Sequence, residues 1–236
     1  SVIEALKFSC YAQGKKPVLE WINAGIFETD PKKVKLLSSF DGILVPGGFG
    51  NRGVEGKIAA IRYAREHQVP YLGLCYGMQL AVIECARHLA GIRGATTREI
   101  DPKSSACVID LMDEQKEKMK HAHYGGSMRL GSYEATLKKG TLARTLYGAD
   151  TIIERHRHRF EVSPLFIERL QDAGVVFSGV SPDGTLMEIM ELPKSQHPFF
   201  IGSQFHPEFQ ARPLDPHPLF TGFIKAAIAY KRRSIL

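Results

Sequence analysis

The feature that most constrains the fold is a sharp junction between an apolar run and a helical pattern. The run Val69–Leu74 ends within Gly73-Leu74-Cys75-Tyr76-Gly77, and residues 76–89 then show helical spacing of apolar side chains. A cysteine between two glycines at such a junction fits a nucleophile elbow, because glycine removes side chains that would clash in the turn. The junction therefore predicts an α/β fold that presents Cys75 at a helix N-terminus.

Short β-rich runs alternate with longer helical patterns along the chain, which is typical of β-α-β units and a mainly parallel central sheet flanked by helices. We expect helices over residues 1–8, 31–38, 54–67, 76–89 and 219–230. We expect strands over residues 18–22, 42–45, 69–74, 106–111, 128–130, 135–137, 151–154, 160–162, 175–180, 186–191 and 199–204. The lysine-rich stretch 113–126 lacks apolar periodicity and is predicted to be a mobile surface loop.

Composition indicates one soluble domain spanning residues 1–236. The chain is 44% hydrophobic, enough to enclose a sizeable core. Its apolar runs fall short of the roughly eighteen residues of a membrane helix, and no signal-peptide pattern is present. The net charge of +6 is dispersed, so neither a membrane nor nucleic acid is expected as a partner. The four cysteines form no C-x-x-C pair, which favours a reduced, cytoplasmic protein without a metal site.

Cys75 is the candidate nucleophile. At a helix N-terminus, the helix dipole and the free amide groups favour the thiolate form of a cysteine. The alternative is that Cys75 is a small buried hydrophobe, which is the interpretation we adopt for Cys10, Cys85 and Cys107.

His206 and Glu208 are the candidate base and its partner. They follow the apolar run 199–205, and residues two apart in an extended chain project to the same side. A carboxylate beside a histidine fixes the tautomer of the imidazole and stabilises its protonated form. Without the cysteine elbow, His206-Pro207-Glu208 would be read as solvated surface side chains.

The glycine-rich loop 46–56 follows an expected strand and leads into a helix. Such a loop can direct backbone N–H groups at an anion, and we expect Gly48 and Tyr76 to donate theirs to an oxyanion. The loop also matches the dinucleotide fingerprint G-x-G-x-x-G, but that fingerprint expects an acidic residue after the next strand, where this chain has Cys75. A tight turn without a ligand is the third interpretation.

Three motifs in this order resemble the class I (triad) glutamine amidotransferases, which have a flavodoxin-like architecture: Pro46–Gly50, Gly73–Gln79 and Phe205–Phe209. Further segments resemble the C-terminal glutaminase domains of the CTP synthase family: residues 1–7, 41–45, 126–131, 154–162 and 217–220. The resemblance extends nearly from end to end.

The resemblance implies that Cys75 forms a γ-glutamyl thioester, with His206 as base and Glu208 as its partner. It implies that L-glutamine is bound by Gly48, Tyr76, Gln79, Glu99 and Arg159. In this assignment Glu99 faces the α-ammonium group and Arg159 faces the α-carboxylate. Geometry agrees for Gln79, one helical turn after Cys75. From the sequence alone, Glu99 and Arg159 would be exposed charges.

The resemblance also implies a partner. A synthetase (amidoligase) half would bind ATP, UTP and Mg, and would use the ammonia to convert UTP to CTP. No cofactor is expected in this domain. The full-length enzyme would be a homotetramer and GTP its allosteric activator, with Phe49, Arg52 and Glu55 in a lid. A helical pattern begins at Ser1 without an initiator Met or a preceding strand, so we expect the chain to be a piece of a longer protein.

Tyr76 departs from the resemblance, because CTP synthases usually have Leu there and GMP synthetases have Tyr. The surroundings of Glu99, Thr96–Arg98, are also unusual. The glutaminase of another triad amidotransferase therefore stays open as an alternative. A cysteine peptidase or deglycase would share the elbow but tends to lack the later His-Pro-Glu strand. A non-catalytic regulatory docking module would leave the Cys, His and Glu set unexplained.

Overall fold

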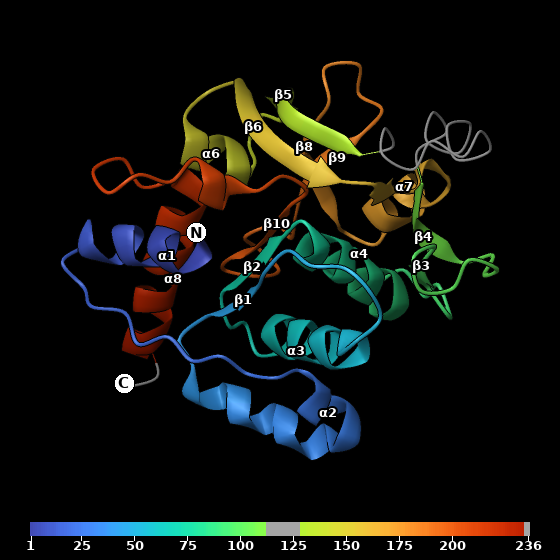
Figure 1. The fold of residues 1–236 in the computed structure, drawn as a ribbon, viewed down its shortest axis with the longest axis horizontal. Coiled ribbons are helices and arrows are strands. Elements are labelled where there is room, and N and C mark those ends of the chain that lie inside the picture. The colour runs from blue at the N-terminus through green and yellow to red at the C-terminus, as the bar shows by residue number, and fades with distance from the viewer. Residues whose placement is uncertain (112–127, 234–236) are drawn as a thin grey trace.

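The computed structural model describes residues 1–111 and 128–233, in which helices cover a central sheet (Figure 1). The sheet has seven strands in the order β1-β2-β10-β9-β8-β5-β6. In that order their bounds are Ile43–Val45, Tyr71–Leu74, Phe200–Ser203, Met187–Glu191, Val176–Val180, Arg129–Leu137 and Thr151–His158. A second sheet has the order β3-β4-β7, with bounds Thr96–Thr97, Cys107–Leu111 and Phe160–Val162.

The strands β1, β2 and β10 form the parallel half of the sheet. β2 lies between β1 and β10, and Leu74 at its end is opposite Ser203 at the end of β10. The amide of Cys75 donates a hydrogen bond to the carbonyl of Ser203 at 2.6 Å. Because the carboxyl ends of parallel strands meet at one edge, the segments that follow these three strands meet there too.

The sheet is mixed, whereas the sequence predicts a mainly parallel one. Four pairings are antiparallel: β10 with β9, β9 with β8, β8 with β5, and β5 with β6. The connection 181–186 between β8 and β9 shows one reason, since a parallel crossover needs about a dozen residues or more. The α/β architecture with flanking helices is confirmed, but parallel pairing is confined to the half that carries the elbow.

Helices form a layer on each side of the sheet (Figure 1). One layer holds α1 (Val2–Tyr11), α6 (Leu142–Tyr147) and α8 (Pro218–Arg233). The other holds α2 (Gly25–Thr29), the 3-10 helix η1 (Pro31–Ser39), α3 (Val54–Glu66) and α4 (Tyr76–His88). The sheet has a hydrophobic core on each side, and strand β2 contributes to both. Tyr71 packs with the α3 and α4 layer, while Leu72 and Leu74 pack with α1 and α8.

The strand predicted over residues 18–22 is wrong. The segment lies along a groove of about 1110 Å³ beside β1, without a ladder partner among the described strands. Val18 is 87% and Trp21 73% exposed. An apolar run becomes a strand only when another strand takes up its N–H and C=O groups, which the sequence of the run cannot guarantee.

Other differences are smaller. The strands expected over 128–130 and 135–137 are parts of one strand, β5. Several short elements were not predicted: α2, α6, β3, α7 (Pro164–Asp172) and the 3-10 helix η3 (Pro207–Phe209). Most span too few residues to show a period. The stretch 113–126 lies outside the described residues. No described helix is long and apolar enough to cross a bilayer.

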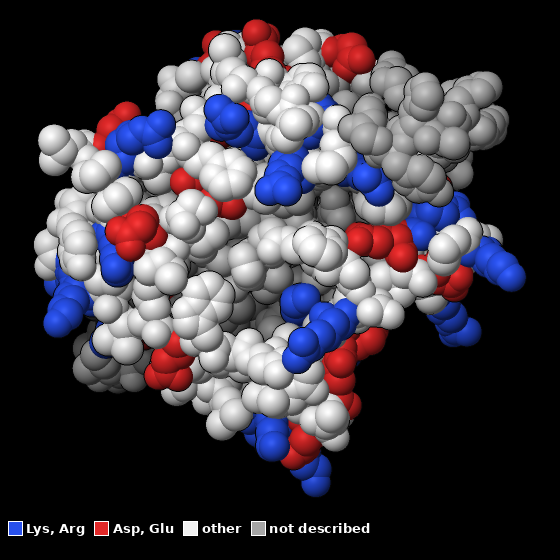
Figure 2. All heavy atoms as spheres, viewed as in Figure 1, with Lys and Arg blue, Asp and Glu red and all other residues white. Residues whose placement is uncertain are grey.

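Charge on the face seen in Figure 2 is mixed. Lys and Arg side chains lie on either side of a central hollow, with Asp and Glu side chains between them. The positive charge forms no continuous stripe on this face, unlike the electrostatic footprint of a nucleic-acid-binding surface.

Candidate active site

Cys75 sits in the turn between β2 and α4 with a positive φ of 49°. This conformation is sterically costly for a residue with a Cβ, so the surroundings must hold it in place. The flanking glycines are required by contact: a Cβ at Gly77 would collide with the carbonyl oxygen of Val45, and one at Gly73 would lie 2.7 Å from the Tyr71 hydroxyl. The predicted elbow geometry is confirmed.

His206 and Glu208 lie beside the elbow. The imidazole Nδ1 of His206 and the carboxylate Oε1 of Glu208 are 2.8 Å apart, and both side chains are largely buried. The expected pairing is confirmed, but it forms where Pro207 begins η3 and not in a continued strand. The backbone amide of His206 donates to the carbonyl of Arg155 at 2.8 Å, and its ring stacks on Phe209.

The pKa of His206 is set by opposing effects. Burial on its own would lower this pKa, but interactions with Cys75 and Glu208 outweigh burial and raise it from 6.5 to about 10. The folded state therefore favours the protonated imidazole. The stability this contributes is fully present below pH 6.5 and is lost as the pH rises through about 10. A protonated imidazole can give its proton to a leaving group.

We predict that His206 stays protonated until about pH 10 when its ring is followed by NMR. Glu208→Gln keeps the size of the side chain but removes its charge, so the midpoint should move down by about 1 to 3 pH units. The matched control is Glu154→Gln, which alters the buried pair of Glu154 and His217 and should leave the His206 titration in place. A wild-type midpoint near 6.5 would contradict the prediction.

The loop after β1 packs against the elbow. A Cβ added at Gly47 would lie 2.8 Å from Cε1 of His206 and 3.7 Å from Cβ of Cys75, and one at Gly48 would lie 3.6 Å from the Tyr76 ring. Tyr76 is the first residue of α4, so its amide is among those without an intrahelical acceptor. Gly47 therefore lies beside Cys75 and Gly48 beside the ring of Tyr76. The donation of the Gly48 and Tyr76 amides to an oxyanion stays a prediction.

Three of the five residues expected to bind glutamine, Gln79, Glu99 and Arg159, have different environments. Gln79 is buried and donates from Nε2 to the carbonyl of Phe160 at 3.0 Å and to Oε1 of Gln204 at 3.2 Å, and its amide oxygen has no hydrogen-bond donor among the described residues. Glu99 accepts from the amide of Gly50 at 2.8 Å. Arg159 lies at the break between β6 and β7, and its buried Nε has no hydrogen-bond partner among the described residues.

The residues expected in a lid lie on the outer part of the same loop and at the start of α3. Phe49 is 88% exposed. Glu55 is paired with Arg87 of α4 through contacts of 2.6 and 3.0 Å. The carbonyl of Arg52 accepts from Lys57 at 3.2 Å. The pair of Glu55 and Arg87 joins α3 to α4, and the contact of Lys57 with Arg52 joins the end of the loop to α3.

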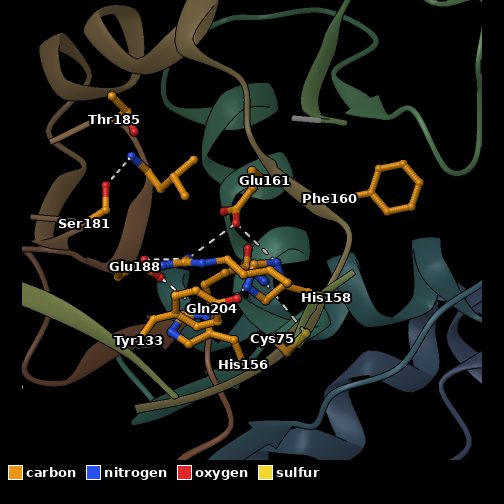
Figure 3. Close-up of polar contacts among 12 residues, drawn as sticks. Cys75, Tyr133, His156, His158, Phe160, Glu161, Ser181, Thr185, Glu188 and Gln204 are labelled. Carbon is orange, nitrogen blue, oxygen red and sulfur yellow. Dashed lines mark hydrogen bonds and ion pairs between the residues drawn. The ribbon is translucent and has the colours of Figure 1, made fainter. Parts of the chain in front are cut away.

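Gln204 is a site residue that the sequence analysis missed. Its Nε2 lies 3.7 Å from the sulfur of Cys75 (Figure 3). Its Oε1 accepts a hydrogen bond from Gln79. It therefore links the candidate nucleophile to a residue expected to bind glutamine. The signal was present in the sequence, because residues 204, 206 and 208 have the spacing of two that places side chains on one side of an extended chain.

A buried polar network lies behind the site (Figure 3). The guanidinium of Arg129 contacts Glu188 at 2.6 Å and Glu161 at 3.7 Å. The rings of His156 and His158 are joined at 2.9 Å, and Nδ1 of His158 lies 3.2 Å from Glu161. The network ties together β5, β6, β7 and β9, which carry these residues.

Burial determines the protonation of this network. It is the largest cause that lowers the pKa of His156 to about 3 and that of His158 well below 6.5, with the charge of Arg129 adding to both. Burial, and then the charge of Glu188, raises the pKa of Glu161 well above 4.5. Burial also raises the pKa of Glu188. Both histidines are therefore neutral, Arg129 is the cation beside Glu188 and Glu161, and burial favours the protonated form of each of these two carboxyl groups.

The cysteine elbow, the glycine-rich loop and the His206–Glu208 pair lie at one edge of an α/β sheet. This combination is that of a triad glutamine amidotransferase. The family model for Glutamine amidotransferase class-I matches residues 1–226. The chain belongs to this family.

Within the family, the chain is similar to CTP synthase. It is 51% identical over 228 residues to "CTP synthase" of Thermococcus gammatolerans and 53% identical over 229 residues to that of Trichormus variabilis. These alignments cover 96% and 97% of the chain but 42% and 41% of the relatives, so the chain spans about two fifths of their length. The glutaminase domain of CTPS from Trypanosoma brucei, solved with bound acivicin, is 35% identical with a TM-score of 0.90. That alignment covers 97% of this chain and 87% of the solved one.

Proposed function

We propose that this chain is the glutamine-hydrolysing domain of a CTP synthase, with Cys75 as nucleophile, His206 as base and Glu208 as its partner. The observation that carries the proposal is the elbow: Cys75 has a positive φ and faces a buried pair of His206 and Glu208. The similarity to CTP synthases over nearly the whole chain supports the choice of substrate.

In the proposed reaction, the thiolate of Cys75 attacks the side-chain carboxamide carbon of L-glutamine. The oxyanion that develops accepts hydrogen bonds from the amides of Gly48 and Tyr76. The carbon–nitrogen bond then breaks, His206 protonates the departing ammonia, and a γ-glutamyl thioester remains on Cys75. Water that gives a proton to His206 attacks the thioester, and glutamate leaves as the thiolate is restored.

We propose that three side chains orient the substrate. The amide oxygen of Gln79 is available for it because Phe160 and Gln204 take both of its donors. The carboxylate of Glu99 suits the α-ammonium group of glutamine and the guanidinium of Arg159 suits its α-carboxylate. The buried Nε of Arg159, which has no hydrogen-bond partner in the described part of the chain, supports this role.

The activity of the complete protein is also a proposal. The ammonia would pass to a synthetase domain that converts UTP to CTP with ATP and Mg. We propose that GTP activates glutamine hydrolysis through a surface that includes Phe49, Arg52 and Glu55, that the full-length protein is a homotetramer, and that it works in the cytoplasm. Nucleotides and Mg would bind the synthetase half, so this domain would need no cofactor.

The proposal is tested by labelling the chain with 6-diazo-5-oxo-L-norleucine, a glutamine analogue with an electrophilic carbon, and locating the adduct by peptide mass spectrometry. We expect one adduct on Cys75, and excess L-glutamine should prevent it. Cys10, Cys85 and Cys107 are buried outside the elbow and serve as internal controls. An adduct on one of these, or labelling that glutamine does not block, would contradict the proposal.

A further inference from the structure

The peptide groups on either side of Gly50 are held by two side chains outside the loop. The carbonyl of Gly50 accepts a hydrogen bond from the hydroxyl of Tyr76 at 2.6 Å. Its N–H donates to Oε1 of Glu99 at 2.8 Å. Gly50 has φ of 79°, a left-handed conformation that glycine adopts readily. We call Tyr76, Gly50 and Glu99 the Gly50 clamp.

Tyr76 is more buried than the loop it contacts. The side chain follows Cys75 at the start of α4 and is 1% exposed. Burial, and then the negative charge of Glu99, raises the pKa of its hydroxyl, so the hydroxyl stays protonated and acts as a donor. The ammonium of Lys57 lies 5.5 Å from the ring centroid. A buried, neutral donor therefore holds a loop in which Phe49, the residue before Gly50, is exposed.

The clamp is close to the part of the loop that reaches the nucleophile, because a Cβ added at Gly47 would lie 3.7 Å from Cβ of Cys75. Gly50 is two residues from Gly48, and a Cβ at Gly48 would contact the ring of Tyr76 at 3.6 Å. The direction of the Gly48 N–H thus depends on where Gly50 is held. An oxyanion donor is effective only when it is fixed before the charge develops.

We propose that Tyr76 is a positioning residue for glutamine hydrolysis, and that its hydroxyl, together with Glu99, fixes Gly50 so that the Gly48 N–H points at the oxyanion. The proposal rests on the proposed glutaminase function. It assigns a role to the hydroxyl of Tyr76, a residue at which the sequence departs from the resemblance and whose replacement by leucine would remove this hydrogen bond. It also gives Glu99 a second role, because one carboxylate holds the loop and is expected to face the α-ammonium group of the substrate.

The test is Tyr76→Phe, which removes one oxygen and keeps the ring. A buried hydrogen bond of this kind is worth about 3- to 10-fold in an equilibrium. We expect kcat for glutamine to fall by about that factor with KM unchanged, and hydrogen exchange of the peptide spanning residues 46–53 to speed up by a similar factor. Alkylation of Cys75 by iodoacetamide needs no oxyanion hole and should keep its wild-type rate.

The matched control is Tyr147→Phe, which removes a buried hydroxyl that donates to Glu154 at 2.7 Å, away from the loop. It should leave kcat and exchange of the 46–53 peptide unchanged. Wild-type kcat and wild-type exchange in Tyr76→Phe would overturn the proposal, as would slower alkylation, since that would indicate damage to the elbow. If wild type itself failed to hydrolyse glutamine, the proposed function would fail, and the exchange comparison would still decide the clamp.

Variants of Glu99 separate its two roles. Glu99→Gln keeps an oxygen that can accept from the Gly50 N–H but loses the charge, so KM should rise while exchange of the 46–53 peptide stays slow. Glu99→Ala loses both, so KM should rise, kcat should fall and the peptide should exchange faster. Equal exchange in Glu99→Ala and wild type would show that Glu99 does not hold the loop.

Discussion

Replacing Cys75 by Ala should abolish glutamine hydrolysis, with a loss on the order of 10⁴-fold or more. The remaining groups cannot form a thioester, so the reaction loses its covalent intermediate and keeps only substrate binding and the oxyanion donors. The measurement is the release of glutamate and ammonia by the purified chain.

The control for this variant is Cys107→Ala, which removes another buried thiol whose sulfur lies 3.4 Å from backbone carbonyls outside the elbow. It should retain hydrolysis. Both variants should remain folded by circular dichroism, because each removes only one small side-chain atom. Turnover that persists in Cys75→Ala would refute Cys75 as the nucleophile.

Arg129→Met should destabilise the fold by about 3–5 kcal/mol, because it removes the cation from a buried group of charges. Glu188 and Glu161 would be left without their partner at 2.6 and 3.7 Å. The pKa of Glu161 is already raised by burial and by Glu188, so the fold favours its protonated form. Its contribution is therefore most favourable below pH 4.5 and declines as the pH rises toward the raised pKa. The loss in Arg129→Met, measured by urea unfolding, should be larger at pH 8 than at pH 5.5.

Two further variants test that explanation. Arg144→Met breaks an exposed pair with Asp150 and should cost less than about 1 kcal/mol. In the double variant Arg129→Met with Glu188→Gln, one of the two carboxylates is neutral, so part of the lost stability should return. A cost for Arg129→Met as small as that for Arg144→Met would contradict the assignment of a buried charge network.

The elbow and the His206–Glu208 pair could be predicted because each is specified by a few neighbouring residues. Gly73 and Gly77 flank Cys75, and the steric reason for both glycines is local. The loop that carries Gly48 could be predicted to lie near Cys75 for a related reason. It follows β1, which is parallel to β2, and β2 ends just before Cys75. Local chemistry and strand direction together locate this edge of the sheet.

The features that could not be predicted depend on contacts between residues that are distant in the sequence. Arg129 and Glu188 are 59 positions apart, and neither lies in a motif that suggests the other. The antiparallel half of the sheet and the unpaired segment 18–22 are decided by which strands meet, and apolar patterns do not specify partners. The contact of Glu99 with Gly50 is likewise invisible in the sequence, where Glu99 reads as an exposed charge.

Strand β10 belongs to both halves of the sheet, since it is parallel to β2 on one side and antiparallel to β9 on the other. The amide of His206, just beyond this strand, donates to Arg155 of β6, which is at the far edge of the sheet. The thiol follows β2, and the imidazole follows β10 and is held by β6. The two groups therefore come together only when these three strands have joined the sheet. A chain in which β6 has not joined the sheet would lack the acceptor of the His206 amide, so turnover by this protein should require both halves of the sheet.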